Sequence, residues 1–180
     1  MIVRFAGIGV ATAAALGSLA VATDRLLAAR GARDDLPIDT FVVVDAPPAD
    51  VWAVLADMPG QPRWMTDLKA VELLDPPPIR AGSRARGIVR ILGIPVADPV
   101  TITAFDAPNR FAIRHDGLFA GDGTIELRPG ADGRSTIVRW RERLVPPLLP
   151  HLAGRVQRPI LRRVFQADLH RLRRLVERPA

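Results

Sequence analysis

Hydrophobic residues recur at every second position along much of the chain between residues 40 and 144, which is the period of a β-strand with one covered face. Runs with this pattern are separated by clusters of proline, glycine, aspartate and asparagine that are typical of turns. Because the connections are short, we expect neighbouring runs to pair as an antiparallel meander. The runs cover residues 40–45, 68–74, 83–92, 100–105, 111–116, 123–128 and 135–144.

The same alternation divides the side chains of the strands between two faces. In the runs 83–92 and 135–144, arginines alternate with small or apolar residues. The sheet is therefore predicted to have one arginine-rich face in water and one apolar face that needs a cover. The residues expected on the covered face include Ala85, Gly87, Val89, Phe111, Ile113, His115, Ile125, Leu127, Val138, Trp140 and Glu142.

The period changes to that of a helix in two places. Residues 48–57 predict a short helix that follows the first strand. From Ile160 onward, apolar residues occupy one arc and arginines the opposite arc, so a long amphipathic helix is predicted to cover the sheet. The apolar positions before Pro159 project to nearly the other side of this helix. We therefore predict a break at Arg158–Pro159, with a separate short helix or lip at residues 147–157.

The first 23 residues form a hydrophobic segment, which residues 24–37 link to a folded domain predicted at residues 38–178. Nineteen uncharged residues suffice to span a bilayer, so the favoured interpretation is a single-pass membrane anchor. One alternative is a secretory signal cleaved near Ala20-Val21-Ala22, and another is a helix on the surface of the protein or of a membrane. Three arginines follow the segment within the linker and one precedes it, which favours a cytoplasmic domain.

The composition excludes several kinds of site. The chain has no cysteine, which rules out disulfides, zinc–thiolate sites, iron–sulfur clusters and cysteine nucleophiles. The three histidines, His115, His151 and His170, lack the spacing of a metal-binding motif, so no metal site is predicted. The glycines form no dinucleotide- or phosphate-binding pattern, and no cofactor is expected.

The net charge of +6 comes from the end of the chain. Residues 37–150 carry twelve arginines and one lysine against fourteen acids, whereas residues 151–180 carry eight arginines against two acids. Basic residues are not interleaved with aromatic ones, so nucleic-acid binding is not expected. The arginine-rich surfaces are either solvated or attracted to anionic lipid headgroups.

The order of elements, together with particular residues, resembles the START-like superfamily. Within it, the chain is most similar to the polyketide cyclase/dehydrase and lipid-transport group, also called SRPBCC. The similarity covers roughly residues 38–178. The segments that carry it are VVVDAPPADVWAVLAD at 42–57, QPRWM at 61–65, Gly82, FDAPNRF at 105–111, GADGRSTIVRW at 130–140 and LHRLRRLVE at 169–177.

The resemblance implies an α+β helix-grip fold, in which a curved antiparallel sheet surrounds a long C-terminal helix and leaves an apolar cavity between them. Members bind lipids, sterols, polyketides, quinones or plant hormones, and a minority are cyclases or hydrolases. The expected partner is therefore a small hydrophobic ligand, and the fold supports binding more strongly than catalysis.

Several residues are candidates for the wall of this cavity. Small inward residues leave room for a ligand, although they also suit a bulky side chain of the helix. Any of the aromatic residues is alternatively part of the core. The candidates are Trp64, Ala85, Gly87, Val89, Phe111, Ile113, Phe119, Trp140, Val164 and Phe165.

Two ionisable residues, His115 and Glu142, interrupt the apolar pattern of the covered face. A histidine–carboxylate pair in an apolar cavity suits general acid–base catalysis on an enolisable ligand, as in a polyketide cyclase or dehydratase. Alternatively, each residue lies at a strand end in water and has no catalytic role. A third hypothesis is a structural domain whose cavity is filled by its own side chains.

Overall fold

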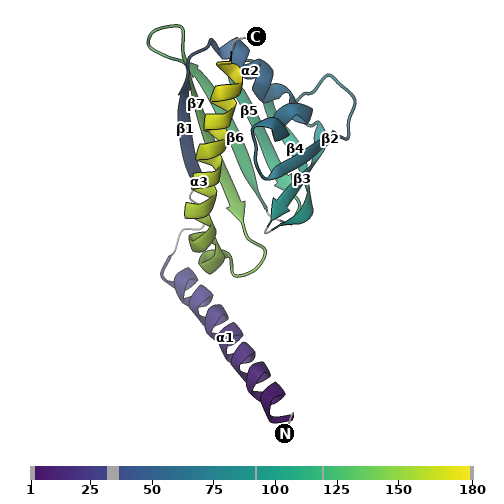
Figure 1. Cartoon of the computed structure of the whole chain (residues 1–180), viewed down its shortest axis with the longest axis vertical. Coiled ribbons are helices and arrows are strands. Elements are labelled where there is room, and N and C mark those ends of the chain that lie inside the picture. The colour runs from purple at the N-terminus through teal and green to yellow at the C-terminus, as the bar shows by residue number, and fades with distance from the viewer. Residues whose placement is uncertain (1–2, 32–36, 92, 119, 179–180) are drawn as a thin grey trace.

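The computed structural model describes residues 3–31, 37–91, 93–118 and 120–178, with the side chains of the first helix described from Leu16 onward. Figure 1 shows the order of the elements along the chain. They are helix α1 (Val3–Ala29), strand β1 (Ile38–Val44), helix α2 (Pro48–Ala56), the 3-10 helix η1 (Met58–Arg63), strands β2 (Leu68–Leu73), β3 (Arg84–Ile91), β4 (Ile94–Asp106), β5 (Arg110–Asp116), β6 (Ala120–Pro129) and β7 (Thr136–Val145), and helix α3 (Pro150–Val176).

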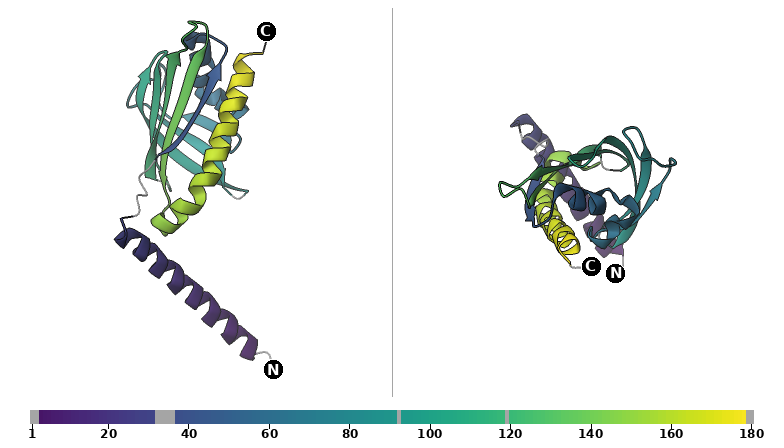
Figure 2. Two further views of the ribbon diagram at one scale, coloured as in Figure 1. Left: turned by 90° about the vertical axis from the view of Figure 1, so that its left-hand side faces the viewer. Right: turned by 90° about the horizontal axis from the view of Figure 1, so that it is seen from above.

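The strands form one seven-stranded antiparallel sheet in the order β1-β7-β6-β5-β4-β3-β2. Strands β2 to β7 pair with their neighbours in sequence, and β1 joins the far edge beside β7. The views in Figure 2 show the sheet curving around α3, α2 and η1, which all lie on its concave side. The predicted α+β helix-grip fold, with its meander and long C-terminal helix, is confirmed.

The predicted alternation of faces places the core on the concave side. Val138 is fully buried while its neighbour Arg139 is exposed, and Leu169 and Leu172 of α3 are fully buried against the sheet. Edge-to-face aromatic pairs continue this core, with Trp52 of α2 meeting a phenylalanine of β4 at a ring-centroid distance of 5.1 Å. The arrangement fixes α2 and α3 against the same concave face.

Strand β4 begins earlier than the sequence pattern predicts. Gly93 and Pro95 mark a break in the sequence pattern, yet Pro95 lies within the strand and pairs with Arg90 of β3, and Pro99 pairs with Arg86. Pairing of β4 with β5 starts only at Val100, so the first part of β4 has a partner on one side alone. Proline is tolerated there because its missing donor can lie on the unpaired side.

Helix α3 runs without a break through Pro159, so the predicted separate helix at 147–157 is wrong. The sequence argument rests on two apolar sets that cannot both be buried by a straight helix. The helix instead leaves apolar side chains on both sides of Pro159 in water, since Val156, from the set before the proline, is 60% exposed and Ile160, from the set after it, is 54% exposed. Exposing two aliphatic side chains is compatible with the continuous helix.

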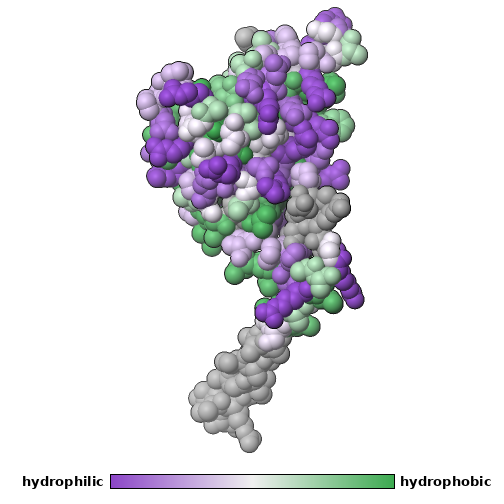
Figure 3. All heavy atoms as spheres, turned by 180° about the vertical axis from the view of Figure 1, so that it is seen from behind, coloured by the Kyte–Doolittle hydropathy of each residue, from purple (hydrophilic) through white to green (hydrophobic). Residues whose placement is uncertain are grey.

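The outward arginines lie beside acidic side chains. The pairs are Arg84–Asp75, Arg86–Glu72, Arg114–Asp116, Arg139–Asp39, Arg141–Glu126 and Arg143–Asp122. Figure 3 shows the face opposite to that of Figure 1, with hydrophilic residues spread over much of the domain and hydrophobic ones gathered towards its end near α1. These ion pairs favour a solvated outer sheet face over one that attracts anionic headgroups, because the positive charges on that face are locally balanced.

The prediction of a single-pass membrane anchor is wrong. In the part of the chain that the structure describes, no helix is both long enough and apolar enough to cross a membrane. The described half of α1 carries Ser18, Thr23, Asp24 and Arg25, which lower its hydropathy. Asp24 instead makes a contact with the domain, since its Oδ1 accepts a hydrogen bond from the backbone amide of Leu152 at 2.9 Å.

Candidate functional site

A cavity of about 640 Å³ lies between the concave face of the sheet, η1 and α3. Most of its wall is apolar. Of the predicted wall residues, those that line it are Gly87, Val89, Phe111, Ile113, Trp140, Val164 and Phe165. Trp64 and Ala85 are instead fully buried in the core and do not line the cavity, and Phe119 lies outside the described residues.

Three ionisable side chains meet on this wall. His115 Nδ1 lies 2.8 Å from Asp98 Oδ2, and His115 Nε2 lies 2.7 Å from Glu142 Oε1. The other oxygen of Glu142 accepts a hydrogen bond from Trp140 Nε1 at 2.7 Å. The His115 side chain is only 12% exposed and that of Glu142 only 4%. The structure thus brings the predicted pair together and adds Asp98 as a third member.

The strand register explains how His115 and Glu142 reach each other. His115 of β5 lies opposite Gly121 of β6, and Glu142 of β7 lies opposite Gly123 of β6. Residues directly opposite each other in an antiparallel pair project to the same face of the sheet. Both glycines therefore leave the concave face of β6 clear between the two side chains. A Cβ added at Gly123 would lie 2.4 Å from Glu142 Oε2, so the carboxylate occupies the space that a side chain would take.

The environment of His115 fixes its charge. Burial by itself lowers the pKa of His115, but the hydrogen bonds and negative charges of Asp98 and Glu142 outweigh it and raise the pKa to about 10. Each ring nitrogen faces a carboxylate oxygen, so both nitrogens donate and the ring is an imidazolium at neutral pH. His115 is therefore already protonated near pH 7 and cannot act as a base there.

The oxygen that remains open is Asp98 Oδ1. The side chain of Asp98 is 20% exposed and lines the cavity, and its Oδ1 accepts no hydrogen bond from any described residue. This oxygen is the group within the cluster that can accept a proton or a hydrogen bond from a ligand. The sequence pattern does not reveal Asp98, because Gly93 and Pro95 resemble a break and place it outside any predicted strand. Its position two residues before the inward Val100 is the signal that identifies it.

A second buried carboxylate, Asp168 of α3, also lines the cavity. Its Oδ1 accepts hydrogen bonds from the backbone amide and hydroxyl of Thr66, at 3.1 and 2.7 Å, and from Arg171 at 2.8 Å. Burial raises the pKa of Asp168, and these donors oppose the rise. The contacts attach the turn after η1 to α3. The sequence signal for Asp168 is an acidic residue within the apolar arc of the C-terminal helix.

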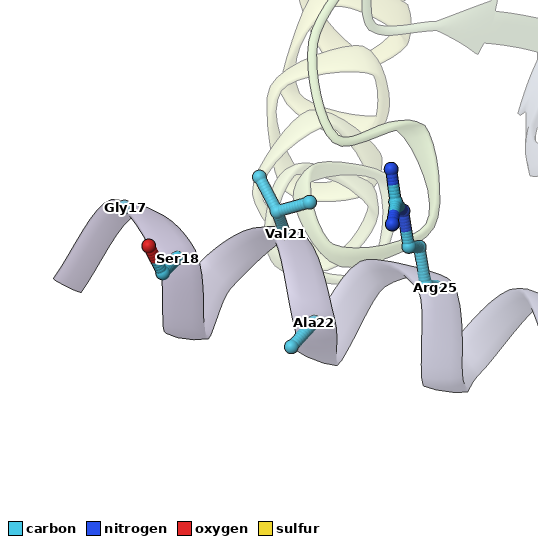
Figure 4. A pocket seen from close by; sticks show the side chains of 5 residues that line it. All are labelled: Gly17, Ser18, Val21, Ala22 and Arg25. Carbon is cyan, nitrogen blue, oxygen red and sulfur yellow. The ribbon is translucent and has the colours of Figure 1, made fainter. Parts of the chain in front are cut away.

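A different surface feature lies on α1, where Gly17, Ser18, Val21, Ala22 and Arg25 line a depression (Figure 4). All of these residues belong to one helix, so they form only one wall of the depression. It lacks the enclosing walls of the cavity between sheet and α3, and the cavity is the better candidate site.

Comparison with protein families identifies the domain. A model of the family described as polyketide cyclase/dehydrase and lipid transport matches residues 37–177. The chain belongs to this family. The match spans the sheet and α3, which together enclose the cavity of this family member.

Solved structures share the fold of the family member. The Zhui aromatase/cyclase from a Streptomyces species is 20% identical with a TM-score of 0.67, and the alignment covers 79% of this chain and 93% of that one. A START superfamily protein from Mycobacterium smegmatis is 17% identical with a TM-score of 0.55, covering 76% and 99%. A protein from Deinococcus radiodurans is 26% identical with a TM-score of 0.59, covering 77% and 95%. No curated protein gives a significant match to the chain.

Proposed function

We propose that the protein binds one small, predominantly apolar molecule in the cavity between the sheet and α3. The observation that carries the proposal is a space of about 640 Å³ walled mainly by apolar side chains from the sheet, η1 and α3. Such a volume falls within the range typical of small-molecule sites. Transfer of apolar ligand surface from water into the cavity would supply the binding free energy, at about 25 cal/mol per Å² before ordering costs.

A fluorescent probe tests this proposal directly. The full-length protein is titrated into the neutral, apolar dye N-phenyl-1-naphthylamine, and saturable enhancement of fluorescence is expected. The variant Ile113→Trp fills part of the cavity, because Ile113 lines it, and should weaken binding about tenfold or more.

The matched control is Ile137→Trp, which adds the same bulk on β7 where the native side chain is 38% exposed. Binding to this variant should stay within about twofold of the wild type, since exposed substitutions are usually near neutral. Absence of dye binding by the wild type, or equal binding by Ile113→Trp and Ile137→Trp, would refute the proposed function.

A second function, acid–base catalysis on a ligand with an enolisable carbonyl, is favoured by the polar cluster on the cavity wall. Asp98 Oδ1 would remove a proton from the carbon next to the carbonyl. The positive charge of the His115 imidazolium, whose two N–H groups stay with Asp98 and Glu142, would stabilise the developing enolate electrostatically. The step conserves charge, because Asp98 becomes neutral when it takes the proton and the ligand becomes a negatively charged enolate. The aromatase/cyclase neighbour adds an analogy of fold to this argument.

Proton exchange tests the catalytic alternative. An apolar ketone such as 2-tetralone is incubated with the protein in D₂O, and deuterium incorporation next to the carbonyl is followed by NMR. The wild type should accelerate exchange over buffer, and Asp98→Asn should remove the acceleration. A wild-type rate equal to that of buffer would exclude this catalytic role for the substrate tested and leave ligand binding as the function.

A further inference from the structure

The charges on the cavity wall do not balance. His115 supplies one positive charge and donates from both ring nitrogens, while Asp98 and Glu142 supply two carboxylates. The three side chains therefore carry one net negative charge in a mostly apolar wall. An unbalanced charge in such a wall is unfavourable unless water or a polar partner satisfies it.

The other charged residues on the wall do not compensate for this excess. Asp168 is paired with Arg171 at 2.8 Å. Arg90, which also lines the cavity, is exposed and follows the opposite parity from Gly87 and Val89 on β3. The remaining lining carboxylate, Asp67, would add to the negative charge.

Of the four carboxylate oxygens of Asp98 and Glu142, one has no hydrogen-bond donor among the described residues. Both oxygens of Glu142 already accept hydrogen bonds, one from His115 and the other from Trp140. Asp98 Oδ2 accepts from His115, but Asp98 Oδ1 has no donor among the described residues. A ligand in the cavity is therefore offered a hydrogen-bond acceptor that bears negative charge.

We infer that the cavity selects apolar ligands that carry a hydrogen-bond donor, such as a hydroxyl or an ammonium group, and places that donor at Asp98 Oδ1. This inference rests on the proposed binding function and names the class of ligand. A donor satisfies the open oxygen, whereas a ligand carboxylate would bring like charge to it without a proton to share. Ligands with the same alkyl chain are therefore expected to differ in affinity according to their polar end group.

A matched series of ten-carbon compounds tests this selectivity on the full-length protein. Decan-1-ol, decylammonium and decanoate each compete with bound N-phenyl-1-naphthylamine at pH 7, below the concentrations at which they form micelles. Decan-1-ol and decylammonium should displace the dye at concentrations about tenfold lower than decanoate. The alcohol and the ammonium compound together separate hydrogen bonding from charge attraction.

The variant Asp98→Asn keeps the size of the side chain and removes its charge. It should reduce the disadvantage of decanoate to about threefold or less, because the like-charge repulsion is lost. The control Asp122→Asn removes a carboxylate from the outer face, where Asp122 pairs with Arg143, and should leave the wild-type order unchanged.

The outcomes distinguish this inference from the function on which it rests. If the dye binds and decanoate competes as well as decan-1-ol, the ligand class is wrong and the binding function stands. If Asp98→Asn binds the dye and keeps the full discrimination, Asp98 is not its origin and the inference fails. If the wild type does not bind the dye, the proposed function itself fails. The wild-type series decides the ligand class even if Asp98→Asn does not fold.

Discussion

Glu142 of β7 and His115 of β5 meet across the intervening strand β6, with 2.7 Å between Glu142 Oε1 and His115 Nε2. Strand β6 contributes glycine at the two positions that face them, so no side chain stands between the two groups. A contact across three strands therefore depends on residues that have no functional group of their own. Glycine here makes room for a charged pair rather than for a turn.

Replacing Gly123 by alanine should break this contact. The new Cβ would lie 2.4 Å from Glu142 Oε2 and 3.0 Å from its Cδ, so the carboxylate must move away from Trp140 or His115. We expect a loss of about 1–3 kcal/mol in the free energy of unfolding, measured by urea denaturation. The control Gly154→Ala, in α3 with nothing within 4 Å of the added Cβ, should be neutral or stabilising. Equal stability of Gly123→Ala and wild type would contradict the steric argument.

The charge of His115 predicts how stability depends on pH. Its pKa of about 10 in the folded protein lies above the ordinary value of 6.5, so the folded state holds this proton more tightly than the unfolded chain. The stabilisation is complete below about pH 6.5 and is lost as the pH rises towards 10. The free energy of unfolding of the wild type should therefore fall over this range.

Urea unfolding at several pH values, beside His115→Gln, isolates this contribution from other groups. The variant should show a flatter dependence between pH 7 and pH 10, since it has no imidazole to titrate. NMR of the His115 ring would follow the titration directly. A ring that becomes neutral near pH 6.5 would show that the two carboxylates do not hold the proton.

The indole of Trp140 is expected to matter through its hydrogen bond as well as its packing. Trp140→Phe keeps an aromatic ring against Phe165, whose centroid is 4.4 Å away, but removes the donor to Glu142. The matched control is Trp64→Phe, because Trp64 is also buried and its Nε1 has no hydrogen-bond partner among the described residues. Trp140→Phe should cost about 1–2 kcal/mol more than Trp64→Phe in thermal or urea unfolding. Equal costs would mean that the bond to Glu142 contributes no net stability.

The contact between Asp24 and the start of α3 predicts a local effect. Asp24 accepts a hydrogen bond from Leu152, the third residue of α3, where a helix has backbone amides without partners inside the helix. Asp24→Ala should increase hydrogen exchange at the Leu152 amide several-fold and cost about 0.5–2 kcal/mol of unfolding free energy. Asp50→Ala, at the first turn of α2, should leave exchange at Leu152 unchanged. Unchanged protection in Asp24→Ala would show that α1 does not hold this end of α3.

Much of the fold and part of the site could be predicted from the sequence, because alternation along a strand reports directly which side chain faces the core. That rule alone places His115 and Glu142 on the covered face. It does not reveal Asp98, since Gly93 and Pro95 resemble a break and the one-sided pairing that tolerates proline there is a property of the whole sheet. Nor does it separate Trp64, which is core, from Trp140, which lines the cavity. That difference depends on packing between elements distant in sequence.

The first half of β4 hydrogen-bonds to β3 but not to β5, whereas His115 lies on β5. Through their backbone, residues 94–99 are therefore attached to the β2–β3 side of the sheet, whereas the rest of β4 is also paired with β5 on the other side. The ion pair between Asp98 Oδ2 and His115 Nδ1, 2.8 Å apart, connects these two sides. A movement of residues 94–99 away from β5 would break this ion pair, so the side chains of Asp98 and His115 restrain the part of β4 that backbone pairing with β5 leaves free.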